Sequence, residues 1–225
     1  MKYINKILVS LFVSFILCNP LSAQKIGIIS GYNLTGLQQS NYGTSGDFNY
    51  LNGFHLGAKL ETQLEPNSDQ YTLSIGALYE MRANRYDIGW YKPYTTQTRF
   101  LYYAVIPIDV NYRYPISENI HLMAFGGPRL NIGLGGLLNQ HYYMSTQAQS
   151  KDYSPFGAGQ AMNGLDFSFG IGTGIELENF QFLLGYDFPL TNSSNESNPS
   201  VLKQHNFRFS IAYMINLQHN KKIVR

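Results

Sequence analysis

Cysteine is nearly absent from this sequence. The 225 residues contain one, Cys18, and it lies in an N-terminal segment that we expect to be removed. The remaining chain then has no thiol with which to form a disulfide, act as a nucleophile or ligate a metal. We therefore expect no disulfide framework, and the sequence suggests neither a metal nor a cofactor.

The chain is also poor in charge and in long apolar runs. Charged residues make up 13% of it. Removing Lys2 and Lys6 with the N-terminal segment lowers the 16 Lys and Arg to 14, against 14 Asp and Glu. A net charge near zero gives no reason to expect nucleic acid as a partner. Beyond the N-terminal segment, no apolar run reaches the roughly 20 residues of a membrane-spanning helix.

The first 23 residues have the pattern of a cleaved secretory signal. Lys2 and Lys6 make the start positive, residues 7–17 form a short apolar stretch, and Ala23 ends a small-residue cleavage motif. The apolar stretch is too short for an anchor helix, and a bulky residue precedes the cysteine, which argues against a lipoprotein. We therefore expect residues 1–23 to be a signal peptide that is cleaved after export through the inner membrane.

Tyrosine and glycine are abundant, with 18 and 21 copies. This composition is unusual for a soluble protein and expected for a membrane barrel with aromatic girdles. Segments of about ten residues alternate between apolar and polar positions, which is the period of a strand with two different faces. We place eight such segments, near residues 25–34, 53–62, 70–82, 99–114, 120–134, 164–177, 180–190 and 205–217.

Charge placement indicates which face of these strands lies inside. Away from the strand ends, each charged residue falls on the polar parity of its own strand: Lys59, Glu61, Glu80, Arg82, Asp109, Arg113, Arg129, Asp166, Glu176, Asp187 and Arg208. A cation on the lipid face would cost about 2–4 kcal/mol at the bilayer midplane. Inside a barrel the same charges can pair with one another. We therefore expect Phe, Tyr, Leu and Ile to face lipid, and a structural charged network to fill the interior; a soluble lipocalin-type barrel needs the opposite arrangement.

The connections have the asymmetry of an outer-membrane barrel. Those after the second, fourth and sixth segments are short, and the others are long (35–52, 83–98, 135–163 and 191–204). In such barrels the short turns are periplasmic and the long loops lie outside the cell. The sequence thus predicts an all-β fold, an eight-stranded antiparallel up-and-down transmembrane β-barrel over residues 24–217, with a polar C-terminal tail at 218–225. Its expected partners are outer-membrane lipid and, during biogenesis, the barrel-assembly machinery.

Two neighbouring stretches carry a family resemblance. They are Tyr103-Ala-Val-Ile-Pro-Ile-Asp-Val-Asn-Tyr-Arg-Tyr-Pro115 and Phe125-Gly-Gly-Pro-Arg-Leu-Asn-Ile-Gly133. Together they resemble the middle hairpin of the PorT-like outer-membrane β-barrel family of Bacteroidota, and Gly170-Ile-Gly-Thr-Gly174 is similar to that family's sixth strand. The resemblance covers essentially the whole mature chain and implies the barrel fold. It also implies a link to secretion, since one member of the family is needed for type IX secretion.

The sequence contains few candidate catalytic residues. A lipid-modifying enzyme would need Ser, His and an acid within reach of one another at the lipid face or rim. His55 and His121 have inward parity, His141 lies in a long loop, and His205 begins the last strand. No outward strand face pairs a His with a Ser, so we interpret each His as a structural or solvated polar residue.

Aromatic residues gather in the long loops, as Trp90, Tyr91, Tyr94, Tyr142 and Tyr143. They suit a recognition surface and equally an aromatic girdle, which we favour. The leading hypothesis is a non-enzymatic barrel with a binding or accessory role in the envelope, acting on a periplasmic or extracellular protein partner. The alternatives are a lipid A- or phospholipid-modifying barrel enzyme and a narrow pore. Because side chains can fill an eight-stranded barrel, the pore is disfavoured.

Overall fold

The computed structural model describes residues 25–41, 44–45, 50–65, 68–87, 94–142, 148–153, 155–156, 162–194 and 201–217. They form ten strands: β1 (Lys25–Asn41), β2 (Thr44–Ser45), β3 (Leu51–Glu65), β4 (Ser68–Asp87), β5 (Tyr94–Ser117), β6 (Ile120–Tyr142), β7 (Ala148–Tyr153), β8 (Leu165–Leu177), β9 (Phe180–Pro189) and β10 (Val201–Asn216). No helix in these ranges has the length and hydropathy to cross a membrane. The expected signal peptide and the C-terminal tail lie outside the described residues.

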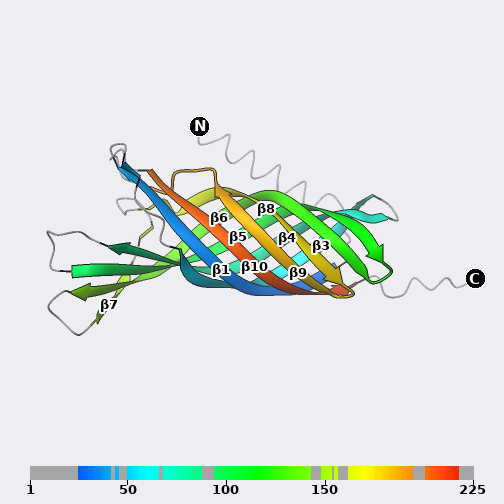
Figure 1. The fold of residues 1–225 in the computed structure, drawn as a ribbon, viewed down its shortest axis with the longest axis horizontal. Helices are drawn as coiled ribbons and strands as arrows, with labels where there is room; N and C mark the ends of the chain where they lie inside the picture. Colours follow the sequence, from blue (N-terminus) through cyan, green and yellow to red (C-terminus); the bar gives the residue numbers. More distant parts are fainter. Residues whose placement is uncertain are drawn as a thin grey trace, which may run out of the picture.

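Eight of the strands close into a ring (Figure 1). Their order is β1-β3-β4-β5-β6-β8-β9-β10, every neighbouring pair is antiparallel, and β10 returns to pair with β1. Each of the eight expected segments forms one strand of this ring. The prediction of an eight-stranded up-and-down barrel is therefore confirmed.

The strands are strongly staggered. Following the paired residues round the ring from Lys25 leads back to Thr35, ten residues further along β1. With strands about 4.8 Å apart and about 3.3 Å per residue, this stagger tilts them by about 40° from the barrel axis. A ring of this size leaves an interior that side chains can fill.

Alternation of side chains divides the wall into two faces. Along β9 the exposed positions are Phe180, Phe182 and Leu184, while Gln181 and Leu183 between them are buried. The same exposure of aromatic and aliphatic side chains recurs on the outer face of the other seven ring strands. Burying each of them in lipid contributes about 1.5–3 kcal/mol, so the outer face is an apolar band suited to the bilayer.

The strands on the long-loop side extend further than the sequence predicted. We expected strands to end near residues 34, 82 and 134 and loops to begin there, yet β1 runs to Asn41, β4 to Asp87 and β6 to Tyr142. The expected loops also contain the short strands β2 and β7. Two-faced alternation is required only where one face meets lipid; beyond the bilayer both faces meet water, so the ladder continues without that signal.

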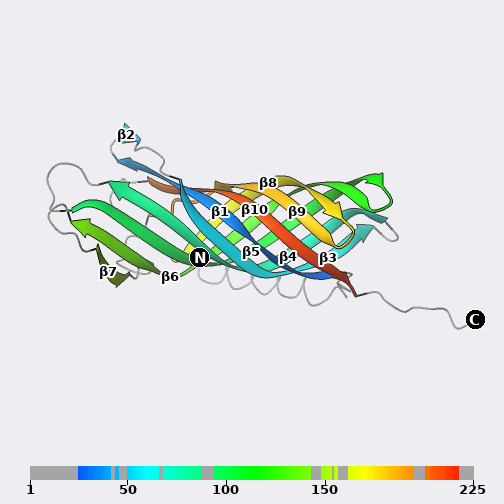
Figure 2. The same ribbon diagram turned by 60° about the horizontal axis from the view of Figure 1, so that its bottom comes forward.

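These extensions form two separate ribbons at the end of the barrel with the long connections, which we call the outer end. Figure 1 shows β5 and β6 continuing past the ring with β7 beside them, where β7 pairs with the outer part of β6. Figure 2 shows β1 and β2 on the opposite side of the same end. At the other end two of the connections are tight turns, Glu118–Asn119 and Glu178–Asn179. The asymmetry of the connections is thus present, with strand replacing much of the expected loops.

Candidate functional site

The inward positions near the short-turn end form one ion-paired cluster around Arg113 of β5. Its guanidinium lies 2.9 Å from Glu176 of β8 and also pairs with Glu61 of β3, and it donates a hydrogen bond of 2.8 Å to the Thr72 hydroxyl. Lys25 of β1 adds a second cation, 3.0 Å from Glu176. We call these residues the lower cluster; it joins five strands across the barrel.

Lys59 connects the lower cluster to the middle of the barrel. Its ammonium donates a hydrogen bond of 3.1 Å to Gln181 and lies 3.7 Å from Glu61. Gln181 in turn donates a hydrogen bond of 2.8 Å to Glu176. The neutral amide of Gln181 thus links the charged groups, so that each of these buried polar groups has a hydrogen-bond partner.

A second group, the upper cluster, begins with Arg129 of β6. Its guanidinium lies 3.2 Å from Asp109 and 3.0 Å from Asp187, and Asp187 also pairs with Arg208 at 3.2 Å. A Cβ at Gly170 would lie 1.6 Å from the Arg129 guanidinium. Glycine at that position is therefore what makes room for the arginine head between the strands.

Arg82 of β4 completes the upper cluster. Its three guanidinium nitrogens donate to Glu80 (2.7 Å), Gln204 (3.2 Å) and Asn131 (2.8 Å). The same guanidinium lies 4.4 Å from the ring centre of Tyr103, within cation–π distance. Each of its three nitrogens thereby donates a hydrogen bond, and the charge has the Glu80 carboxylate as its partner, which explains how the cation tolerates burial.

Residues beyond the upper cluster cover the outer mouth of the barrel. Met162 is 2% exposed, and the Phe156 ring packs edge-on against Tyr103 with centroids 5.2 Å apart. Asp166 accepts hydrogen bonds from the hydroxyls of Ser193 (3.1 Å) and Thr191. The segments before β8 and after β9 are thus tied to the top of the charged interior rather than standing away from it.

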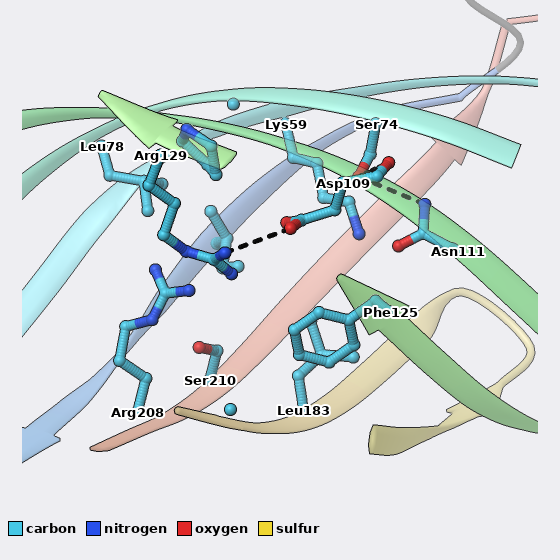
Figure 3. Close-up of a pocket in the computed structure, with 14 residues that line it drawn as sticks. Lys59, Ser74, Leu78, Asp109, Asn111, Phe125, Arg129, Leu183, Arg208 and Ser210 are labelled. Atoms are coloured by element: carbon cyan, nitrogen blue, oxygen red, sulfur yellow. Dashed lines mark hydrogen bonds and ion pairs between the residues drawn. The ribbon is translucent and has the colours of Figure 1, made fainter. Parts of the chain in front are cut away.

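A small cavity of about 40 Å³ lies between the two clusters. Figure 3 shows Phe125, Leu183 and Leu78 on its walls together with the Arg129–Asp109 ion pair. The wall also contains the inward glycines Gly76 and Gly185. A site that holds one water needs about 10–15 Å³ by this measure, so the cavity has room for very few atoms.

One hydrogen-bonded chain beside this cavity has the geometry of a nucleophile and its base. The Ser210 hydroxyl lies 2.9 Å from His55 Nε2, and His55 Nδ1 lies 2.7 Å from Asn33 Oδ1. Because an amide oxygen only accepts, Nδ1 carries the proton and Nε2 accepts from the serine. His55 is 1% exposed and Asn33 is fully buried.

The structure buries all eleven charged residues that the sequence placed inside. It brings ten of them into ion pairs, and Asp166 into hydrogen bonds with hydroxyls. The loop aromatics are less well placed. Trp90, Tyr91 and Tyr143 lie outside the described residues; Tyr94 and Tyr142 are paired with each other at the outer ends of β5 and β6, and their side chains are not described.

Sequence reasoning missed the uncharged half of the interior. Asn33, Asn111, Asn131, Gln181 and Gln204 are buried and bonded to the network, and their strand parity could have identified them. The Ser210–His55 pair was not predicted either, because a lipid-modifying site is expected at the lipid face or the rim and this pair lies inside the barrel. His121 is half-buried near the short-turn rim, and His205 lies 2.6 Å from the Tyr186 hydroxyl. Within the described ranges no three His, Asp or Glu residues are placed to hold a metal.

Comparison with known proteins gives a family and several similar folds. The outer membrane protein beta-barrel domain family matches residues 22–195. No curated protein matches the chain. Among solved structures, Ail of Yersinia pestis is 13% identical with a TM-score of 0.40, covering 85% of this chain and 98% of its own.

Two further solved structures are similar at the same level. The N-terminal β-barrel domain of Pseudomonas aeruginosa OprF is 10% identical with a TM-score of 0.36, covering 85% of this chain and 98% of its own. The outer membrane enzyme PagL is 14% identical with a TM-score of 0.39, covering 86% and 99%.

Proposed function

The chain belongs to the outer membrane protein beta-barrel domain family, and from that premise we propose that it is a packed, non-enzymatic platform that binds a partner at its outer end. It is a small outer-membrane β-barrel. The observation that carries the proposal is the filled interior: two ion-paired clusters occupy the barrel, and Met162 and Phe156 cover its mouth. What the barrel offers to other molecules is therefore its ends and its outer surface.

The proposal includes the route to the membrane and the biological setting. Residues 1–23 act as a cleaved signal, and the extended ribbons of β5, β6 and β7 face outside the cell because they arise on the long-connection side. The resemblance of residues 103–115 and 125–133 to the PorT-like family supports an accessory role in secretion. Charge alone gives no reason to expect nucleic acid as the partner, and a protein partner fits the strand ribbons that continue past the ring.

Two measurements test this platform. Planar-bilayer recording of the refolded barrel is expected to show no steady ion conductance, and sustained channels would replace the platform with a pore. Replacing residues 139–150 by Asn-Gly, a two-residue turn that connects the paired residues Leu138 and Lys151, shortens the β6–β7 ribbon without changing the ring. We expect this variant to insert into the membrane normally but to fail to complement a strain that lacks the gene. Full complementation by the variant would contradict a role for the outer end.

A second candidate function, lipid modification, is favoured by the Ser210–His55–Asn33 chain alone. The position of these residues within the barrel argues against lipid modification. Ser210 lies between Phe209 and Ile211, in the middle of the five outward apolar positions of β10. That height is about 15 Å from either edge of a 30 Å hydrocarbon core, whereas lipid esters lie near the edges. The adjoining cavity of about 40 Å³ cannot hold an ester group with its chains.

The two candidates differ in reactivity. A fluorophosphonate probe is expected to leave the folded wild-type protein unlabelled, and lipid A and phospholipid profiles are expected to be the same with and without the gene. Labelling of the wild type that is abolished by Ser210→Ala, together with a changed lipid profile, would establish the enzyme instead.

A further inference from the structure

The charges of the lower cluster balance one another without Lys59. Lys25 pairs with Glu176. Arg113 pairs with Glu176 and Glu61, so two cations face two carboxylates there. Lys59 lies 3.7 Å from Glu61, a carboxylate that Arg113 already neutralises. The charge of Lys59 is therefore added to the charges around the cavity, which this lysine lines.

The cavity has an excess of one positive charge on its wall. Arg129 and Arg208 line it and share one partner, because Arg129 Nε lies 3.0 Å and Arg208 Nη2 lies 3.2 Å from the same oxygen, Oδ1 of Asp187. Asp109 also lines the cavity and pairs with Arg129 at 3.2 Å. Together with Lys59, three cations thus meet two carboxylates at this height of the barrel.

One further interior carboxylate would balance this excess, but it lies far from the cavity. Arg82 and Glu80 pair with each other, which leaves Asp166 at the outer mouth. Asp166 is six residues along β8 from Gly172, which pairs with Gly185 of the cavity wall. Six residues of strand span about 20 Å, and at that distance the attraction between two charges is about a fifth of its strength at 4 Å.

The residual exposed surface of the interior charges belongs to this cavity. Of the eleven interior charged residues, Asp109 (9%), Lys59 (8%) and Arg208 (7%) are the most exposed, the others being at 4% or less. All three line the cavity. The Arg208 guanidinium donates from Nη2 to Asp187, and its buried Nε has no acceptor among the described residues. A cation with unused N–H groups therefore borders the space.

The size of the cavity selects a small occupant. Figure 3 shows Lys59, Asp109, Arg129 and Arg208 around it, with Phe125 closing another side. Its volume of about 40 Å³ is roughly that of three waters at 10–15 Å³ each by the same measure. This is room for one monatomic ion with a water or two, and not for a phosphate or sulfate with its five heavy atoms.

We propose that the cavity binds a small monovalent anion, chloride, which the excess positive charge of Lys59, Arg129 and Arg208 holds in place. A buried charge without a partner is costly, and a chloride ion at this height supplies the missing negative charge. The site goes beyond the platform role and does not depend on it, because the anion binds inside the wall and the partner at the outer end.

The surroundings of the cavity determine how the anion enters. The Arg113 ion pairs lie below it, and the Arg129–Asp187 ion pair lies above it. The chloride ion is therefore enclosed when the strands close into the ring, and it exchanges through unfolding and refolding. A ligand that binds only the folded state stabilises it in proportion to the logarithm of the ligand concentration.

Crystals of the wild-type barrel refolded in sodium bromide test the site directly. Bromide replaces chloride and is identified by its anomalous scattering. We expect an anomalous peak in the cavity beside Lys59 and the two arginines. Density in the cavity without anomalous signal would show water, and peaks confined to exposed cations such as Lys203 would show an adventitious ion only; either result would overturn the proposal.

Urea unfolding in phosphatidylcholine vesicles tests the cause of binding. Sodium chloride is exchanged for sodium gluconate, a much larger anion, at constant ionic strength. We expect the unfolding equilibrium constant of the wild type to fall about tenfold for each tenfold rise in chloride above its Kd. Lys59→Met removes the excess charge and is expected to abolish this dependence, whereas Lys203→Met removes an exposed cation of β10 and should retain it.

Asp109→Asn gives a prediction of opposite sign. It removes one carboxylate from the cavity wall, so the excess becomes two charges and the chloride dependence should begin at a lower concentration. A wild type whose stability does not depend on chloride, or an equal dependence in all three variants, would mean that no anion binds here and that the excess charge is relieved in another way, such as a neutral Lys59. The bromide crystals decide the question even if a variant fails to fold.

Discussion

Arg208 and Phe209 are neighbours in β10 but lie in opposite surroundings. Arg208 is 7% exposed and its guanidinium lies 3.2 Å from Asp187 inside the barrel. Phe209 is 49% exposed on the outer face. The inner face is stabilised by specific pairs among buried charges, whereas the outer face needs only to be apolar. One therefore expects the stability of the barrel to depend on the identity of each inner residue, but only on whether each outer residue is apolar.

Removing the centre of the lower cluster should have the largest effect. Arg113→Met leaves Glu61 and Glu176 buried with one arginine fewer between them, and loss of one partner of a buried pair costs about 3–5 kcal/mol. We expect the free energy of unfolding, measured by urea titration of the barrel in lipid vesicles, to fall by that amount. The adjacent outward change Tyr114→Phe is the control and should alter it by less than about 0.5 kcal/mol.

The double change Arg113→Met, Glu176→Gln sharpens this prediction. It removes one carboxylate together with the arginine and keeps the pair of Glu61 with Lys59, so that if unpaired charge is the cause most of the lost stability is recovered. A double variant as unstable as Arg113→Met, or a stable single variant, would mean that packing around residue 113 and not ion pairing holds the inner face.

Placing a cation on the outer face should have the next largest effect. Phe209→Arg puts a charge near the bilayer midplane, at a cost of about 2–4 kcal/mol. The matched change Arg208→Gln removes one inner cation, but Asp187 keeps its ion pair with Arg129 at 3.0 Å, so about 1 kcal/mol is expected. Folded barrel migrates faster than boiled barrel on SDS gels, so the share of unboiled protein in the faster band measures the folded fraction. If Arg208→Gln lowered this fraction more than Phe209→Arg did, the assignment of inner and outer faces would be reversed.

The two faces also explain how much of the fold and of the inner ion pairs could be predicted from the sequence. Period-two alternation located all eight ring strands, because lipid outside and charges inside impose it on every residue of the spanning segments. It failed beyond the bilayer, where β5 begins at Tyr94 and not near residue 99, since neither face is selected there. Parity predicted which charges face inward. It did not predict that Arg129 joins Asp109 to Asp187, because partners across the barrel depend on stagger.

The cavity and the Ser210–His55 contact were beyond the sequence for a related reason. Both arise from side chains of several strands whose relative height is set by the ten-residue stagger. His55 and Ser210 are 155 positions apart, and nothing local marks them as neighbours.

Adding one methyl group to either face should have an intermediate effect. Gly126 and Gly127 are adjacent on β6 and have opposite parity. A Cβ at Gly127 would lie 1.9 Å from the Ile108 carbonyl oxygen, whereas at Gly126 its nearest neighbour is 3.2 Å away. We expect Gly127→Ala to lower the free energy of unfolding by about 1–3 kcal/mol, and Gly126→Ala to change it by less than about 0.5 kcal/mol. Equal effects in urea titration would mean that the wall is as tolerant inside as outside.

Single hydrogen bonds should give the smallest difference between the faces. Ser210→Ala removes the partner of His55 Nε2, and an unsatisfied buried group costs about 1–3 kcal/mol. Because Ser210 lines the cavity, a water there can take over the hydrogen bond and reduce this cost to about 1 kcal/mol. On the outer face Thr173 donates a 2.8 Å hydrogen bond to the Met123 carbonyl, which lies in the β6–β8 ladder. Thr173→Ala should therefore cost only a few tenths of a kcal/mol, about what a surface substitution costs. Urea titrations of both variants in the same vesicles measure the difference. A larger loss for Thr173→Ala than for Ser210→Ala would show that hydrogen bonds facing lipid, and not those of the interior, are the ones that this barrel cannot lose.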